Sequence, residues 1–174
     1  NNRIKSKIIN FKEINTLGRD IKKKVAYDLK KIVLKRKNFL KNVNFLEPSI
    51  MGILNLTPDS FSDGGKFFKK NSKTELDLNK ISFELDYLEK NGASFIDIGA
   101  ESTRPGHTEI SVQEELDRLM PALELVAKSN CIISIDSRKP EIIKEVLNYP
   151  IGLINDVSAL DSLESKKLIR DHNI

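Results

Sequence analysis

Apolar and polar positions follow two alternating patterns between residues 49 and 174. Short, nearly continuous apolar runs are typical of strands buried on both faces, and apolar residues spaced three or four apart are typical of helices with one buried side. The expected strands are SIMGILNLT, ASFIDIGAES, CIISIDS and IGLINDVSAL, and the expected helices are TELDLNKISFELDYLEKNG, SVQEELDRLMPALELVAKSN, KPEIIKEVLNYP and DSLESKKLIRDHNI. This βαβαβαβα order predicts a parallel sheet covered by helices, either a doubly wound sheet or a (β/α)8 barrel. No glycine-rich nucleotide-binding motif follows the first strand, which weakens the nucleotide-binding versions.

Residues that start and stop helices support these boundaries. Gly92 follows the first expected helix, at a position where glycine often ends a helix. Ser111 and Glu114 match a capping box at the start of the second helix, and Pro121 is expected to kink it. Pro140 lies in the first turn of the third helix, where its missing N–H costs little.

Residues 1–48 follow a different pattern. Apolar residues spaced three or four apart predict one apolar stripe on a helix from about Asp20 to Lys37. The stripe consists of Ile21, Val25, Leu29 and Ile32. The segment holds 14 Lys and Arg against 4 Asp and Glu, whereas residues 49–174 hold 15 against 21. We therefore expect a Lys-rich helical leader or linker over 1–48 and a separate unit over 49–174. The alternative is that residues 1–48 form an arm that binds nucleic acid or an anionic membrane. The sequence contains no nucleic-acid-binding motif, and neither partner is expected.

The composition changes this picture little. The chain has 174 residues and no run of about 18 apolar residues that could span a bilayer. Its first residues, NNRIKSKIIN, lack the apolar block of a secretory signal. The one cysteine, Cys131, opens an expected strand and is interpreted as a small core residue. A reducing, cytoplasmic location is expected.

Polar side chains recur where the expected strands end. They are Asn55 after the first strand, Glu101 to Arg104 after the second, Asp136 after the third, and Asn155 with Asp156 after the fourth. Ligands of parallel α/β folds bind at the carboxyl ends of the strands, so one concave polar site is expected there. Each residue also has a simpler interpretation: Asn55 and Asp156 as turn formers, Asp136 with Ser137 as a helix cap, and Arg104 as a solvated loop residue.

Four motifs together resemble one family. MGILNLTPDSFSDGG, DIGAESTRPG, SIDSRKP and INDVSAL, between about Ile50 and Leu160, are similar to the motifs of dihydropteroate synthase, a pterin-binding TIM-barrel enzyme of folate biosynthesis. The resemblance implies a (β/α)8 barrel of which this chain holds the first four βα units, preceded by the basic helical leader. Residues 1–48 show no such resemblance.

The resemblance also implies a reaction and site residues. The family joins 6-hydroxymethyl-7,8-dihydropterin pyrophosphate to p-aminobenzoate and releases pyrophosphate, with Mg²⁺. Asn55 would contact the metal, which takes its other oxygens from water and substrate phosphates. The loop from Thr57 to Gly65 would be a lid, with Phe61 over the p-aminobenzoate pocket. Thr103 and Arg104 would contact the pyrophosphate.

The same resemblance assigns the pterin pocket. Asp136 and Asn155 would hold the edge of the pterin ring, and Asp136 would stabilise positive charge as pyrophosphate departs. Ile53 and Val157 would be apolar walls of the pocket. Asp97, inside the second strand, is expected to support this network.

The match stops after four of the eight units that a barrel needs. The chain is therefore interpreted as the N-terminal half of a dihydropteroate synthase, which is either inactive or one of two chains that form the enzyme together. We expect it to aggregate, to associate as a homodimer or to pair with a C-terminal half-barrel chain. The leader would be the joining segment of a fused upstream pterin pyrophosphokinase. A methyltetrahydrofolate-binding methyltransferase of the related pterin-binding type is the alternative, but it is not expected to carry both TPDSFSDGG and STRPG.

Overall fold

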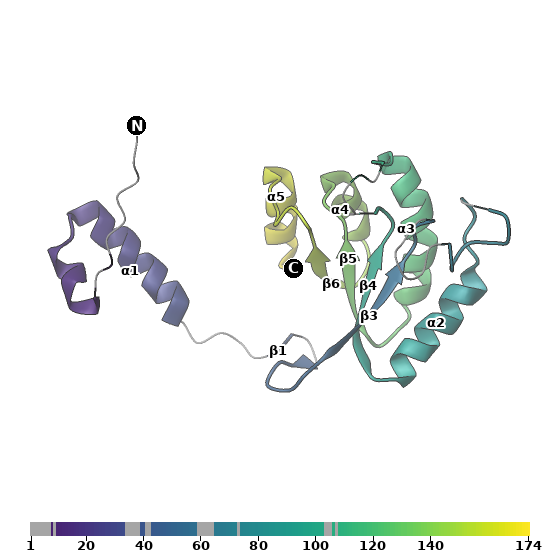
Figure 1. The fold of residues 1–174 in the computed structure, drawn as a ribbon, viewed down its shortest axis with the longest axis horizontal. Helices are drawn as coiled ribbons and strands as arrows, with labels where there is room; N and C mark the ends of the chain where they lie inside the picture. The colour runs from purple at the N-terminus through teal and green to yellow at the C-terminus, as the bar shows by residue number, and fades with distance from the viewer. Residues whose placement is uncertain are drawn as a thin grey trace. The chain divides into compact units, whose positions relative to one another are not determined.

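The structure, a computed structural model, describes residues 8, 10–33, 39–40, 43–58, 65–72, 74–102, 106 and 108–174. The chain divides into two units, residues 1–38 and residues 39–174 (Figure 1). The smaller unit contains the 3₁₀ helix η1 (Phe11–Thr16) and the helix α1 (Arg19–Val33), which confirms the helix expected in this region. Its described residues include none that is buried, and Ile21 and Ile32 are 60% and 74% exposed.

The larger unit begins with a short hairpin at Phe39, whereas the boundary expected from the sequence falls between residues 48 and 49. Strands β1 (Phe39–Leu40) and β2 (Val43–Asn44) pair antiparallel. Val43 is buried against Phe95 and Ile132, and Phe45 stacks on Phe95 with ring centroids 6.2 Å apart. These apolar contacts join the hairpin to the sheet that follows.

The main sheet has four parallel strands in sequence order. They are β3 (Ile50–Asn55), β4 (Ala93–Gly99), β5 (Ile132–Asp136) and β6 (Ile151–Asn155). The helices after them are α2 (Leu78–Lys90), α3 (Val112–Val126), α4 (Pro140–Val146) and α5 (Leu163–His172). All eight expected elements are confirmed in type and order.

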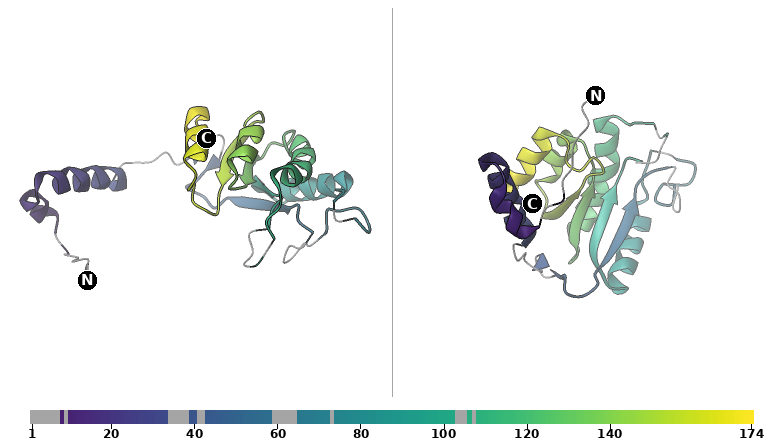
Figure 2. Two further views of the ribbon diagram at one scale, coloured as in Figure 1. Left: turned by 90° about the horizontal axis from the view of Figure 1, so that it is seen from above. Right: turned by 60° about the vertical axis from the view of Figure 1, so that its left-hand side comes forward.

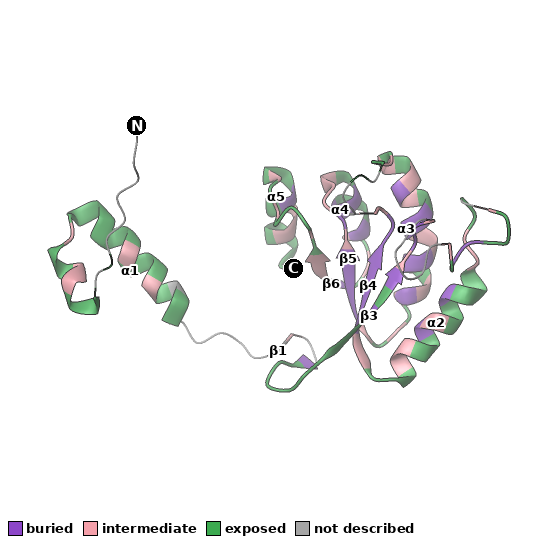
Figure 3. Ribbon diagram, viewed as in Figure 1, coloured by how far each residue is buried: buried purple, intermediate pink, exposed green. Residues whose placement is uncertain are grey.

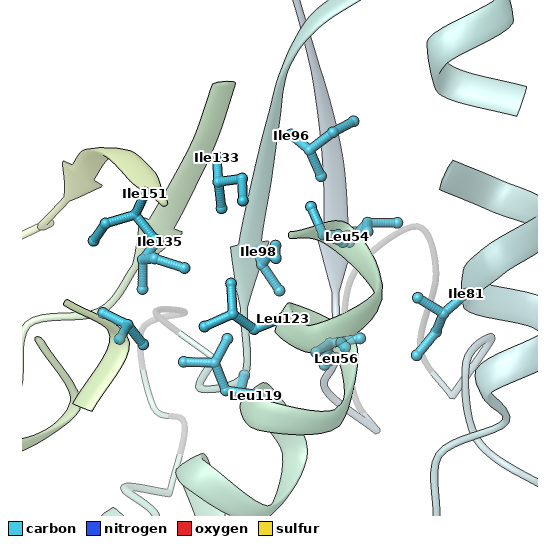
Figure 4. Close-up of a cluster of buried hydrophobic side chains, with 14 of the residues drawn as sticks. Leu54, Leu56, Ile81, Ile96, Ile98, Leu119, Leu123, Ile133, Ile135 and Ile151 are labelled. Carbon is cyan, nitrogen blue, oxygen red and sulfur yellow. The ribbon is translucent and has the colours of Figure 1, made fainter. Parts of the chain in front are cut away.

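Helices α2 to α5 cover one face of this sheet (Figure 2). Successive parallel strands joined by right-handed crossovers place every connecting helix on the same side. The core lies between the helices and that face, as Figure 4 shows. Its fully buried side chains include Leu54, Ile98 and Ile135 from the strands and Leu123 from α3.

The opposite face of the sheet is only partly covered. Phe95 and Ile132 lie under the β1–β2 hairpin, but Met51 and Ile53 are 39% and 53% exposed. Part of β3 is accordingly coloured as exposed in Figure 3. In the described part of the chain, β3 and β6 each pair with one neighbouring strand. A barrel closes only when its first and last strands meet, so this sheet has the form of an open part of a barrel.

The helix ends agree with the signals in the sequence. Ser111 caps α3 by accepting a hydrogen bond from the backbone N–H of Glu114, and α3 continues through Pro121. Pro140 occupies the first turn of α4. Gly92 follows α2 with a φ of +89°, a left-handed conformation that favours glycine. None of the helices in the described ranges has the length and apolar character needed to cross a membrane.

Candidate rim site at the carboxyl ends of the strands

Three of the polar residues singled out in the sequence lie in one row across the sheet. Asn55 pairs in register with Gly99, Gly99 with Asp136, and Asp136 with Asn155. In-register neighbours of parallel strands direct their side chains to the same face. The alternating burial of β3, with Leu54 in the helix-covered core, assigns this row to the open face. The expected convergence of Asn55, Asp136 and Asn155 is therefore present in the backbone register.

A second row lies two residues earlier in each of the four strands. Ile53, Asp97, Ser134 and Leu153 pair in register in this order. Asp97 is 6% exposed, and its Oδ2 accepts a hydrogen bond from Asn155 Nδ2 at 3.1 Å, which links the two rows. The buried Asp97 Oδ1 and Ser134 Oγ find no hydrogen-bond partner among the described residues. Buried polar atoms normally have partners, so the pair is suited to a polar ligand or water.

Asp136 ends β5 in surroundings that oppose its ionisation. Burial, and after it the negative charges on nearby carboxylates, raise its pKa from 3.8 to about 6. These carboxylates belong to Asp97, Glu115, Asp156 and Glu101. The carboxylate also lies over Gly99, where an added Cβ would be 3.1 Å from Asp136 Oδ2. A carboxylate held in this way can accept hydrogen bonds from N–H groups of a ligand.

The other residues of the predicted site are less uniform. Ile53 is on the open face, and Val157, two residues beyond β6, is 65% exposed. Asp156 is a turn former, because its carboxylate accepts hydrogen bonds from Ser158 and from the backbone N–H of Leu160. Phe61, Thr103 and Arg104 lie outside the described residues.

The ends of the loop that contains Phe61 are described. Thr57 is 5% exposed, and its carbonyl accepts a hydrogen bond from the backbone N–H of Gly65 at 3.3 Å. Gly65 has a φ of +75°, so a glycine suits this closure. Both ends of the loop are thus held near the end of β3, beside Asn55.

A buried ionic network supports the rim, and the sequence reasoning missed most of it. Lys139 Nζ lies 2.9 Å from Glu115 Oε2 and 3.1 Å from Glu101 Oε1. Ser137 donates its hydroxyl hydrogen to Glu115 Oε1 at 2.6 Å. Lys139, not Asp136 or Ser137, occupies the N-cap position of α4, so the helix-cap interpretation of Asp136 is wrong.

A signal for this network was present in the sequence. Glu115 and Arg118 occupy positions on the apolar stripe of α3, beside Leu119 and Ala122, and are 0% and 7% exposed. A charged residue on the buried side of an amphipathic helix needs a partner, because an unpaired buried charge is costly. Arg118 finds its partners in Glu114 and in the backbone carbonyl of Ala100.

The donor set at the rim fits Mg²⁺ only in part. Within the described residues, no group of three or more His, Cys, Asp or Glu side chains is placed to hold a metal ion. The neutral amide oxygen of Asn55 could supply one hard oxygen ligand, and Mg²⁺ commonly takes the others from water and substrate phosphates. The residues therefore fit a metal that arrives with a phosphorylated ligand rather than one held in a protein cage.

A hollow of about 550 Å³ lies elsewhere, at the amino ends of the strands. It is lined by β2, the segment before β3, the end of α2, the start of β4 and the two residues before β5, and contains none of the rim residues. Since ligands of parallel α/β folds bind at the carboxyl ends of strands, the polar rows are the candidate site.

Sequence comparison assigns the class of protein. Residues 51–174 match the pterin binding enzyme family, and the chain belongs to this family. Within the family, its relatives include the dihydropteroate synthase of Haemophilus influenzae, 48% identical over 114 residues that make up 65% of this chain and 38% of that protein. A mitochondrial folate synthesis bifunctional protein of Arabidopsis thaliana is 47% identical over 114 residues, 63% of this chain and 19% of that protein.

Structural comparison agrees with the sequence. The dihydropteroate synthase of Xanthomonas albilineans with 4-aminobenzoic acid superposes with a TM-score of 0.63 and 34% identity, over 80% of this chain and 50% of that one. The chain thus spans half or less of the length of these relatives. The resemblance to dihydropteroate synthase and the incomplete α/β barrel predicted from the sequence are both confirmed, and the match is consistent with a partial, N-terminal portion.

Proposed function

We propose that the chain supplies the pterin-binding half of a dihydropteroate synthase, which condenses 6-hydroxymethyl-7,8-dihydropterin pyrophosphate with p-aminobenzoate to give dihydropteroate and pyrophosphate. The observation that carries the proposal is the in-register row of Asn55, Asp136 and Asn155 at the carboxyl ends of three strands, in a chain of the pterin-binding family. Asp97, bonded to Asn155, extends the same polar face inward.

In this proposal the two polar rows recognise the pterin. The edge of the ring offers N–H donors and nitrogen acceptors, which a carboxylate from Asp136 and an amide from Asn155 can match. The unpaired Asp97 Oδ1 and Ser134 Oγ add two further buried positions for hydrogen bonds. Ile53 and Val157 supply apolar contacts to the ring faces. Asp97 also fixes the orientation of the Asn155 amide through their 3.1 Å hydrogen bond.

Asp136 is assigned the electrostatic role in the condensation. As pyrophosphate leaves, positive charge develops on the pterin, and an ionised carboxylate beside it stabilises that charge. Because the pKa of Asp136 is raised to about 6, the carboxylate is ionised above this value and is held in a site of low solvation, where its charge acts strongly. No proton transfer by Asp136 is needed.

The remaining groups are assigned to the second substrate and the leaving group. Thr103 and Arg104 would bind the pyrophosphate, and Phe61 would cover p-aminobenzoate. Asn55 would hold Mg²⁺ together with pyrophosphate oxygens; when bound, the ion neutralises charge on the leaving phosphate. The bifunctional Arabidopsis relative supports a further proposal, that residues 1–48 connect the barrel to another folate-synthesis domain.

Condensation assays test the proposal directly. The chain alone is expected to bind the dihydropterin pyrophosphate weakly and to turn over little or no p-aminobenzoate. Addition of the C-terminal half of a related dihydropteroate synthase, expressed separately, is expected to restore product formation. Full activity of the chain alone would contradict the proposal that it holds only half of the site. Absence of activity both without and with the C-terminal half, when sedimentation shows that the two halves associate, would contradict the assigned reaction.

A further inference from the structure

The ammonium group of Lys139 joins three separate parts of the chain. Its Nζ lies 2.9 Å from Glu115 Oε2 in α3, 3.1 Å from Glu101 Oε1 just beyond β4, and 2.7 Å from the carbonyl oxygen of Ile110 before α3. The ammonium group donates hydrogen bonds to Glu101 Oε1 and to the Ile110 carbonyl, and its contact with Glu115 Oε2 is an ion pair. Glu101 Oε1 also accepts the backbone N–H of Ile110 at 3.2 Å, which closes the arrangement.

The cluster is almost completely removed from solvent. The side chains of Lys139, Glu101 and Glu115 are 11%, 7% and 0% exposed. Burial alone would raise the pKa of Glu101, but its bonds to Lys139 and Ile110 outweigh burial and hold the pKa below 4.5. Burial would likewise lower the pKa of Lys139, and the bonds to Glu115 and Glu101 raise it instead. Arg138, whose Nε lies 3.7 Å from Glu101 Oε2, adds a second positive group beside the cluster.

Stability gives a weak reason for such a cluster. Apolar residues of similar volume can replace a buried ionic cluster with little loss, and sometimes with a gain, because desolvation offsets most of the attraction. The two carboxylates of the cluster are also unfavourable for Asp136, because Glu115 and Glu101 add to burial in raising its pKa. A role in the arrangement of the rim is the better explanation.

The cluster is connected to the residue that follows Asp136. Glu115, whose Oε2 faces Lys139, accepts the Ser137 hydroxyl hydrogen on Oε1 at 2.6 Å. The backbone N–H of Ser137 donates to the carbonyl oxygen of Asn155 at 3.1 Å. A chain of contacts thus runs from Lys139 through Glu115 and Ser137 to Asn155 at the end of β6. It holds both the residue that follows Asp136 and the residue that pairs with Asp136 in the sheet.

We propose that Lys139 is a positioning residue of the rim: by holding Glu115 it fixes the turn at Ser137, and so the placement of the Asp136 and Asn155 side chains toward a ligand. The effect on pterin rests on the proposed function, whereas the effect on the turn does not. Lys139 touches no substrate in this role and acts only through Glu115, Glu101 and Ser137.

Three substitutions test the proposal, with Lys144→Met, at an exposed position of α4, as the matched control. Lys139→Met removes the ammonium group, and Lys139→Arg keeps the charge and several donors. Ser137→Ala keeps the ammonium group but removes the hydroxyl that donates to Glu115 Oε1 and accepts the backbone N–H of Lys139. Amide hydrogen exchange is measured in the chain without ligand. Affinity for 6-hydroxymethyl-7,8-dihydropterin pyrophosphate is measured by fluorescence, with the separately expressed C-terminal half of a related synthase present.

Lys139→Met is expected to accelerate exchange at the amides of Ser137 and Ile110 while the amide of Ile98, in the core of β4, keeps its protection. Pterin affinity should fall about tenfold or more, the loss expected when a bond to a charged group is removed. Lys139→Arg should recover most of that affinity. Ser137→Ala should weaken pterin binding with little change at Ile110, and Lys144→Met should change neither measurement.

A purely structural role gives a different pattern. Exchange would then rise equally at Ser137 and Ile98, and pterin affinity below the melting temperature would not change; this result would overturn the proposal. If Lys139→Met does not fold, Ser137→Ala and Lys139→Arg decide, and unaltered affinity with Ser137→Ala would overturn it. If the unsubstituted chain binds no pterin, the proposed function fails, and the exchange pattern alone decides whether Lys139 holds the turn.

Discussion

Asp136 carries a charge that its surroundings make unfavourable. Burial is the first cause of its raised pKa, and four neighbouring carboxylates add to it. The carboxylate nevertheless occupies the most central polar position of the rim, between Gly99 and Asn155 in the sheet register. Groups with perturbed pKa values concentrate at functional sites, because interactions with a ligand can offset the free energy that the buried charge costs in the free protein.

Asp136→Asn is expected to stabilise the fold near pH 7 and to weaken pterin binding. Between pH 3.8 and about 6 the folded chain retains a proton on Asp136 that the unfolded chain releases. Stability attributable to this group therefore falls as the pH rises through that window, and the full cost remains above it. Thermal melts should show a higher melting temperature for the variant at pH 7, with the difference shrinking as the pH approaches 3.8. A lower melting temperature at pH 7 would contradict the assignment.

Strands and helices meet at close contacts that only small residues permit. Gly52 of β3 lies against Leu88 of α2, where an added Cβ would be 2.8 Å from Leu88 Cδ1. On the other face of the sheet, the absence of a side chain at Gly99 of β4 leaves room for the Asp136 side chain of β5. The first contact serves helix packing, and the second serves the site.

Gly99→Ala should therefore damage the site more than the fold. The new Cβ would be 3.1 Å from Asp136 Oδ2 and 3.2 Å from its Cβ, so the carboxylate must shift by a few tenths of an ångström. We expect a loss of pterin affinity of about tenfold and a change in unfolding free energy of about 1 kcal/mol or less. Fluorescence titration and thermal melts measure the two effects. Gly18→Ala, where no atom lies within 4 Å of the added Cβ, is the control, and equal affinity in both variants would contradict the prediction.

The elements could be predicted from the sequence because their hydrophobic periods differ so clearly. β5 is largely apolar before Asp136, interrupted only by Ser134, and α3 repeats apolar residues every three or four positions, so the type and order of both elements were confirmed. The row of Asn55, Asp136 and Asn155 followed from the parallel order alone. Lys139 could not be assigned in this way, since its partners Glu101 and Glu115 come together only through the packing of α3 against the start of α4.

The larger unit as a whole presents an open sheet. Among the described residues, β3 and β6 each have one free edge, and the side chains of Ile50 and Ile53 are 56% and 53% exposed. Free strand edges and exposed apolar side chains are sites where other chains pair. In the longer relatives, of which this chain matches half or less, there is enough chain to cover such a face.

The isolated chain is accordingly expected to associate with itself. Sedimentation velocity over micromolar to millimolar concentrations should show species larger than the monomer. Ile53→Lys, on the open face, should reduce association, whereas Leu163→Lys, at an 82% exposed position of α5, should not. A strictly monomeric chain with a cooperative melt across this range would show that the open face is tolerated in water.

Strand alignment and ligand recognition depend on each other in this sheet. Side chains alternate between the two faces, so a shift of β5 by one residue against β4 would turn Asp136 toward the helix-covered face and Ile135 toward the open face. A misaligned molecule would lose its hydrophobic core and its affinity for ligand in the same event. Selection for binding alone is then sufficient to eliminate misfolded conformers, and retention on a ligand column would purify the correctly paired sheet.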